Sequence, residues 1–192
     1  MHETYDGLYR PEFEKGSCGF GLIAHMDDQP SHWLVRTAIT ALERLTHRGA
    51  VAADGKTGDG CGLLLKKPDA FLRAIARESE LVLADDYASG LVFFAPESAQ
   101  REHARGIVAN ALANQGIDLA GWRLVPTDPS ACGDEALKTL PHIEQIFVNA
   151  TAGMERSEFQ RRLFLARRQA EKALQSQDDH FYIPSLAVDV IA

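Results

Sequence analysis

Apolar and polar residues along this chain follow two repeating patterns, one typical of helices and one typical of strands. Three segments place apolar residues at the three- and four-residue spacing of an amphipathic helix. These segments are residues 31–47, 97–115 and 155–175. In the last segment the apolar stripe is expected to be buried, and it consists of Phe159, Leu163, Ala166, Ala170 and Leu174.

Residues that favour helix ends flank the first of these segments and also indicate one further helix. Ser31 precedes the first segment, where a serine hydroxyl can cap the free amides of a helix. Gly49 follows it, where glycine suits a left-handed cap. Pro68 is expected to open a further short helix that places Phe71, Leu72 and Ile75 on one face.

Six short runs are rich in β-branched and aromatic residues and predict strands. They are residues 18–24, 61–65, 90–95, 122–125, 142–148 and 181–191. Interspersed with the helices, these strands predict a domain of mixed α+β class. The last run ends the chain as an apolar strand without a turn, which predicts a domain that is incomplete at its C-terminal side, because folded domains normally cover such an edge.

Size and charge restrict the class of protein. The chain has 192 residues, of which 45% are hydrophobic, so it is long enough to bury the core of one domain. A formal net charge of -7 argues against nucleic acid as a partner, because binding phosphates requires a basic surface. No apolar stretch reaches the length needed to cross a bilayer, so no membrane association is expected.

The cysteines and histidines do not predict a metal site or a disulfide framework. Cys18, Cys61 and Cys132 lie far apart in the sequence, which fits a reducing cytoplasm. The seven histidines have no spacing typical of zinc ligands. Without further information, Cys61 and Cys132 are best interpreted as thiols in or near the core.

Three other patterns have simple structural interpretations. Lys56 and Thr57 suggest a phosphate-binding loop, but Ala50 stands where that motif requires its first glycine. Glycines in residues 58–62 suggest a dinucleotide loop, but the strand-turn-helix context is missing. The arginines within residues 161–168 share a helix with Glu155, Glu158 and Glu171, which predicts a solvated helix face with ion pairs.

Three separated motifs resemble one known family. They are LYRPEFEKGSCGFGLIA at residues 8–24, LERLTHRGAVAADGKTGDGCGLLL at residues 42–65 and FYIPSL at residues 181–186. Together they are similar to the N-terminal class II glutamine amidotransferase domain of glutamate synthase large subunits. The resemblance implies a cleaved leader, residues 1–17, followed by a domain that starts at residue 18 and continues through residue 192.

The resemblance assigns the nucleophile to Cys18, which cleavage would make the first residue. A free α-amino group has a pKa of about 7.7–8.0, so part of it is unprotonated at neutral pH and can accept the thiol proton. The thiolate would attack the side-chain amide of L-glutamine and release ammonia, and water would then release glutamate.

Arg48 corresponds to an arginine that the family keeps near the nucleophile. A fixed guanidinium there would favour the thiolate and orient polar groups. Arg48 also suits the end of a helix, where cations are favoured, and the two roles are compatible. Asp59 is expected near the substrate only because of its place in the motif.

The family's fold is a four-layer αββα sandwich of the N-terminal nucleophile hydrolase type. Its oxyanion hole uses an Asn-Gly pair, and no Asn-Gly occurs in this chain. Losing one oxyanion donor costs about 3 kcal/mol in comparable enzymes, so the chain alone is expected to have little activity.

The resemblance further implies a larger parent enzyme. The parent would transfer the ammonia to 2-oxoglutarate, an oxidoreductase reaction that uses FMN, an iron–sulfur cluster and NADPH. The chain has no group of closely spaced cysteines that could bind an iron–sulfur cluster, so no cofactor is assigned to it. The expected partners are L-glutamine, the remainder of the large subunit and a small subunit.

Two alternatives remain open at this point. The chain could belong to another class II amidotransferase, although its Leu-Tyr-x-Pro-Glu-Phe-Glu leader is more typical of glutamate synthase. It could also be a binding or regulatory module that keeps the fold without catalysis.

Overall fold

The computed structural model describes residues 19–45, 50–58 and 60–192. Contacts within the chain divide it into two compact units, Met1–Ala50 and Val51–Ala192. This boundary differs from the division expected after residue 17, and the assignment of residues 1–17 as a leader stays a prediction.

The described part of the first unit contains one helix, α1 (His32–Arg44). The Ser31 hydroxyl accepts a hydrogen bond from the Trp33 amide at 3.2 Å, which confirms the predicted N-cap. The apolar stripe that includes Leu34 and Leu42 is only half-buried. The helix ends at Arg44 with Leu45 as its C-cap, earlier than predicted, and the predicted cap residue Gly49 lies outside the described residues.

Two predicted strands are wrong or shorter than expected. Residues 19–24 form no strand, and Phe20 and Leu22 in that stretch are 94% and 89% exposed. The predicted strand at residues 61–65 is reduced to β1 (Leu65–Lys66), which pairs only with the two-residue strand β6 (Val190–Ile191). Apolar content favours a strand, but a strand also needs a partner backbone, and a single sequence does not show which partner is available.

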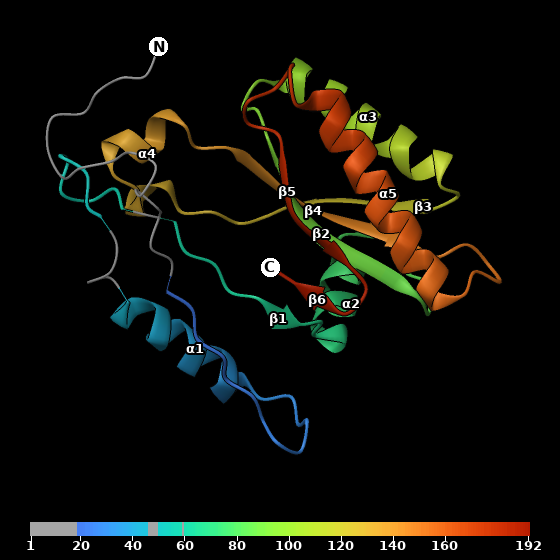
Figure 1. Cartoon of the computed structure of the whole chain (residues 1–192), viewed down its shortest axis with the longest axis horizontal. Helices are drawn as coiled ribbons and strands as arrows, with labels where there is room; N and C mark the ends of the chain where they lie inside the picture. Colours follow the sequence, from blue (N-terminus) through green and yellow to red (C-terminus); the bar gives the residue numbers. More distant parts are fainter. Residues whose placement is uncertain (1–18, 46–49, 59) are drawn as a thin grey trace, which may run out of the picture. The chain divides into compact units, whose positions relative to one another are not determined.

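The second unit is built on a four-stranded antiparallel sheet, drawn near the centre of Figure 1. Its strands are β2 (Tyr87–Phe94), β3 (Asp118–Leu124), β4 (His142–Asn149) and β5 (Tyr182–Ala187), in the order β3-β4-β2-β5. All four overlap predicted strands, but the single strand predicted over residues 181–191 is divided into β5 and β6, which belong to different sheets. The chain is therefore of the predicted α+β class.

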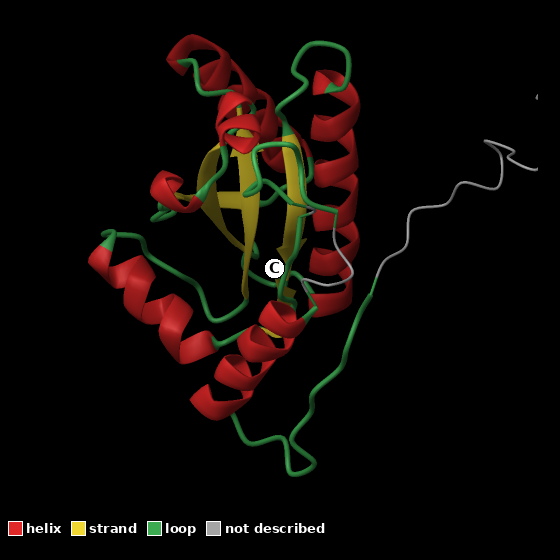
Figure 2. Cartoon of the chain, turned by 90° about the vertical axis from the view of Figure 1, so that its left-hand side faces the viewer, coloured by secondary structure: helices red, strands yellow, loops and turns green. Residues whose placement is uncertain are grey.

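Two long helices, α3 (Ser98–Asn114) and α5 (Arg156–Leu174), cover one face of this sheet. They lie side by side in Figure 1, and Figure 2 shows the longest helix standing along the yellow sheet. The predicted stripe of α5 is confirmed, since each of its five residues is at most 2% exposed. Val92 and Phe94 of β2 and Ile146 of β4 complete this core from the sheet.

The opposite face of the sheet carries a smaller apolar cluster under helix α2 (Asp69–Glu78). Leu72 and Ile75 of α2 contribute to it as predicted, but Phe71 is 60% exposed and lies off the buried face. Further along this face, the Gln145 amide donates to the Ser89 hydroxyl at 3.2 Å, and both residues are buried. This face is therefore apolar at one end and polar near its middle.

An ion pair joins helix α3 to β4, with the acid buried and the base partly exposed. Glu144 of β4 is 2% exposed, and the Arg105 guanidinium donates to both of its carboxylate oxygens, at 2.5 and 2.9 Å. His142 Nε2 lies 2.8 Å from the same carboxylate. Removing the partner of a buried charge typically destabilises the fold, because the charge that stays buried keeps its full desolvation cost.

Gly90 is expected to be indispensable to the sheet. A Cβ at this position of β2 would lie 1.9 Å from the Ser185 carbonyl oxygen and 2.7 Å from Leu186 Cα, both backbone atoms of β5. We therefore expect Gly90→Ala to lower the free energy of unfolding by about 1–3 kcal/mol or more. Urea unfolding followed by far-ultraviolet circular dichroism measures this change.

Gly106→Ala is the matched control. Gly106 lies within α3, and nothing lies within 4 Å of a Cβ placed there. Alanine is favoured over glycine inside a helix by about 0.5–1 kcal/mol, so this variant should be more stable than the unaltered protein. Equal stability of the two variants would contradict the assigned β2–β5 packing.

Candidate active site

The residues that the sequence assigns to catalysis, Cys18 and Arg48, lie outside the described residues, and so does Asp59. Their roles stay predictions. The structure does describe residues 50–58, which lie between Arg48 and Asp59 in the sequence and belong to the second of the three motifs that carry the family resemblance.

Residues 51–58 form a compact loop. Val51 and Gly58 form an isolated antiparallel bridge, and the Ala52 amide donates to the Thr57 carbonyl at 2.7 Å. Gly55 has φ 69°, a conformation that glycine adopts without steric cost. The predicted turn at the glycine-rich motif is thus confirmed over these residues.

The Asp54 carboxylate connects this loop to a distant segment. Its Oδ1 accepts from the amides of Lys56 and Thr57, at 2.9 and 2.8 Å. Its Oδ2 accepts from the Thr57 hydroxyl at 2.5 Å and from the Glu135 amide at 3.1 Å. The Thr57 hydroxyl oxygen in turn accepts from the Ala136 amide at 3.2 Å. Asp54, Thr57, Gly133, Glu135 and Ala136 are called the Asp54 cluster below.

Asp54 and Thr57 of the loop cap helix α4 (Asp134–Lys138) from outside that helix. Its N-cap residue, Gly133, makes no side-chain cap, so the loop supplies acceptors for the Glu135 and Ala136 amides. A Cβ on Gly133 would lie 2.4 Å from the Thr57 hydroxyl oxygen and 2.5 Å from Asp54 Oδ2. The two segments approach each other this closely because residue 133 has no side chain.

The hydrogen bonds from Thr57, from the Lys56 amide and from the Glu135 amide hold the pKa of Asp54 well below its ordinary value. Asp54 is therefore a carboxylate at neutral pH, and all its donors favour the charged form. Sequence reasoning interpreted this stretch as a turn and did not find the link to Glu135, since no local pattern indicates a contact across 81 residues.

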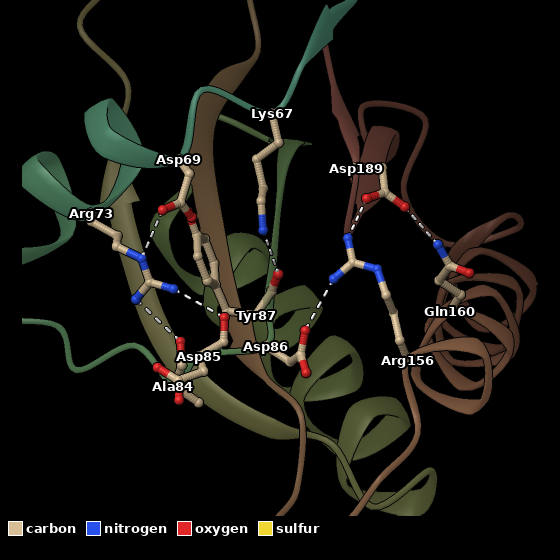
Figure 3. A network of polar contacts seen from close by, with 10 residues as sticks. All are labelled: Lys67, Asp69, Arg73, Ala84, Asp85, Asp86, Tyr87, Arg156, Gln160 and Asp189. Carbon is tan, nitrogen blue, oxygen red and sulfur yellow. Dashed lines mark hydrogen bonds and ion pairs between the residues drawn. The ribbon is translucent and has the colours of Figure 1, made fainter. Parts of the chain in front are cut away.

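A second polar network lies where the strands β1 and β6 meet the main sheet (Figure 3). Arg156, at the start of α5, donates to Asp86 at 3.0 Å and also to Asp189, which lies between β5 and β6. Gln160 donates to the second oxygen of Asp189 at 2.8 Å. The Lys67 amide donates to the Asp189 carbonyl at 2.7 Å, so Asp189 links three parts of the unit.

Tyr87 is the other centre of this network (Figure 3). Its hydroxyl donates to Asp69 at 2.9 Å, and the Lys67 ammonium lies 3.9 Å from the centre of its ring. Burial and the hydrogen bond to Asp69 raise the pKa of Tyr87 above its ordinary value. Arg73 donates to Asp69 at 3.0 Å, so charges of both signs surround the phenol.

The remaining sequence predictions on chemistry have mixed outcomes. Cys61 is exposed and Cys132 is half-buried, both as free thiols. Arg161 and Arg162 share Glu158, and Arg167 and Arg168 share Glu171, which confirms the predicted ion pairs on α5. Within residues 19–45, 50–58 and 60–192, no group of three or more His, Cys, Asp or Glu side chains could hold a metal ion. No helix in the same ranges is long and apolar enough to cross a membrane.

Comparison with known proteins identifies the family. Residues 18–192 match the family described as class-II glutamine amidotransferases. The chain belongs to this family. The match covers more than nine-tenths of the chain and begins at Cys18, the residue that the sequence motifs assign as nucleophile.

Curated class II amidotransferase relatives include large chains of glutamate synthase. The NADPH enzyme of Bacillus subtilis is 36% identical over 186 residues, which is 96% of this chain and 12% of the relative. The large chain of Azospirillum brasilense is 38% identical over 187 residues, again 96% and 12%. Ferredoxin-dependent glutamate synthase 2 of Synechocystis is 34% identical over 180 residues, which is 93% of this chain and 11% of the relative. The chain thus spans about 12% of the length of the curated relatives it matches.

Arg156 is expected to stabilise this amidotransferase chain by joining separate elements. Arg156→Gln removes the charge from two ion pairs and should lower the free energy of unfolding by less than about 1 kcal/mol, because both pairs are about half exposed. The effect should shrink at high salt, where exposed charges are screened. Urea unfolding at two salt concentrations measures both effects.

Arg161→Gln is the control, because Arg161 pairs only within α5 and Arg162 still pairs with Glu158 in its absence. It should change stability less than Arg156→Gln does. Hydrogen exchange at the Lys67 amide should accelerate only in Arg156→Gln, since that amide donates to Asp189. Equal exchange rates in the two variants would show that Arg156 does not hold the β5–β6 turn.

Proposed function

We propose that residues 18–192 are the glutamine-hydrolysing part of a glutamate synthase, with Cys18 as the nucleophile. The observation that supports this most directly is the family match, because it begins at Cys18 and leaves residues 1–17 outside it. Removal of the leader between Ser17 and Cys18 would make Cys18 the first residue and give it a free α-amino group.

In the proposed mechanism the α-amino group of Cys18 accepts the proton of its own thiol. The sulfur attacks the side-chain carbonyl carbon of L-glutamine, and the carbon–nitrogen bond then breaks as the protonated amine returns a proton to the leaving ammonia. Water adds to the γ-glutamyl thioester, the carbon–sulfur bond breaks, and glutamate and the thiol are released. The Arg48 guanidinium would favour the thiolate through its fixed positive charge.

The four-layer αββα sandwich is part of this proposal. Helices α3 and α5 with the main sheet would form two of the layers. On the opposite face Phe93 and Ile143 are half-buried and Tyr182 is 54% exposed, so a second sheet could bury them further. The short pair β1–β6 would be the beginning of that sheet.

We propose that the ammonia is used by the rest of a larger enzyme. The relatives are named as NADPH or ferredoxin-dependent glutamate synthases and are about eight times as long as this chain. FMN, an iron–sulfur cluster and NADPH would belong to that remaining part, where 2-oxoglutarate is converted to glutamate, with a small subunit as partner. Because the relatives named above are all glutamate synthases, neither a different class II amidotransferase nor a non-catalytic module is favoured.

Cys18→Ser in the complete enzyme is expected to lower glutamine-dependent activity by about 1,000-fold or more, because the nucleophile is lost. Activity with added ammonia should stay unchanged, since it bypasses glutamine hydrolysis. Cys61→Ser is the matched control and should leave both activities intact, because Cys61 is an exposed free thiol. Glutamine use that survives Cys18→Ser, or Met1 at the N-terminus of the active enzyme, would refute the mechanism.

Arg48→Lys keeps the charge but loses the planar set of donors. We expect kcat/KM for glutamine to fall by about 10-fold, which equals about 1.4 kcal/mol of transition-state stabilisation. Arg44→Lys, a change in the last turn of α1, should have little effect. If Arg48→Lys and Arg48→Ala both leave hydrolysis unchanged, Arg48 has no role in catalysis.

A further inference from the structure

The Asp54 cluster has a feature that a simple surface turn does not need. A turn is closed by the bonds from Asp54 Oδ1 to the amides of Lys56 and Thr57. The bond from Oδ2 to the Glu135 amide, at 3.1 Å, adds nothing to the turn itself. It attaches the loop to a segment that lies 81 residues further along the chain.

Three further contacts strengthen this attachment. The Ala136 amide donates to the Thr57 hydroxyl, and the Lys56 ammonium donates to the Ser130 carbonyl at 3.2 Å. Gly133 permits the close approach, because any Cβ there would collide with Thr57 and Asp54. The loop is therefore joined to residues 130–136 through its backbone, its side chains and its packing.

The place of this loop in the sequence gives the attachment a functional meaning. Val51, at one end of the loop, follows Arg48 by three residues, and Gly58, at the other end, directly precedes Asp59. In the sequence, Arg48 and Asp59 thus lie within three residues of a loop whose backbone is held in place. Displacement of catalytic groups by about 1 Å can lower a rate by about 100-fold.

We infer that Asp54 is a positioning residue for glutamine hydrolysis, acting by attaching the loop of residues 51–58 to the start of α4. The inference rests on the proposed function, whereas the contacts of the Asp54 cluster are observed independently of it. Asp54 does not contact the substrate in this account. It holds the loop that lies between Arg48 and Asp59 in the sequence.

Asp54→Asn in the complete, processed enzyme tests this inference. The asparagine oxygen can still close the turn, but its amide nitrogen would face the Glu135 amide, and two donors cannot bond to each other. We expect faster hydrogen exchange at the Glu135 amide and a fall of about 10-fold or more in kcat/KM for glutamine, as a displacement of well under 1 Å would give. Ammonia-dependent activity should stay unchanged.

Asp128→Asn is the matched control. Asp128 Oδ1 also accepts from an amide and a hydroxyl, but both belong to Ser130, so its bonds stay within three residues. This variant should leave exchange at Glu135 and glutamine hydrolysis unchanged. Thr57→Val removes the acceptor of the Ala136 amide, so it should speed exchange at Ala136 and lower glutamine hydrolysis. Thr57→Ser keeps the hydroxyl and should leave both measurements as in the unaltered enzyme, even if Asp54→Asn folds poorly.

The outcomes separate the inference from the proposed function. Unchanged exchange at Glu135 in Asp54→Asn and at Ala136 in Thr57→Val would overturn the attachment. Faster exchange with unchanged glutamine kinetics would overturn the positioning role and leave the Asp54 cluster a purely structural cap. Glutamine hydrolysis that survives Cys18→Ser would refute the proposed function, whereas the exchange result would still decide whether the attachment exists.

Discussion

The second unit depends on one constraint, which is that strand β2 must bury both of its faces. Each of its residues from Tyr87 to Phe94 pairs with β4, and β5 pairs along its other edge. Val92 and Phe94 face the core under α3 and α5, whereas Tyr87 faces the cluster under α2. Because side chains alternate along a strand, a shift by one residue would exchange these two environments and place Tyr87 in the larger core. The register of β2 therefore fixes both faces of the sheet at once.

The sequence predicts this sheet and its two long helices well, because their apolar residues follow a single repeat over many positions. The stripe of α5 is an example, since Phe159 and Leu174 lie at its two ends and both are buried. It predicts residues 19–24 and 61–64 poorly, because these stretches are apolar without being paired. Periodicity indicates which face of an element is apolar. Whether another backbone lies within hydrogen-bonding distance is decided by the tertiary fold.

The candidate site shows the same division between local and long-range information. Cys18 and Arg48 could be proposed from short motifs, because the chemistry of an N-terminal cysteine is specified by neighbouring residues. The link from Asp54 to Glu135 could not be predicted, since an aspartate followed by glycine in a polar stretch is typical of any turn. The network around Tyr87 and Arg156 was missed for a similar reason. Its members come from α2, β2, α5 and the β5–β6 turn, and each is an ordinary charged or polar residue in its own sequence context.

The buried pair of Arg105 and Glu144 restricts how this sequence can change over time. Replacing Arg105 alone leaves the buried Glu144 carboxylate without the guanidinium that bonds both of its oxygens, which costs about 3–5 kcal/mol, whereas replacing both with apolar residues of similar volume is often neutral. The two positions lie in different elements, 39 residues apart. A path that begins with the loss of Arg105 therefore passes through an unstable intermediate, so descendants that have lost Arg105 should have lost Glu144 as well. His142, bonded to the same carboxylate, would lose that contact together with Glu144.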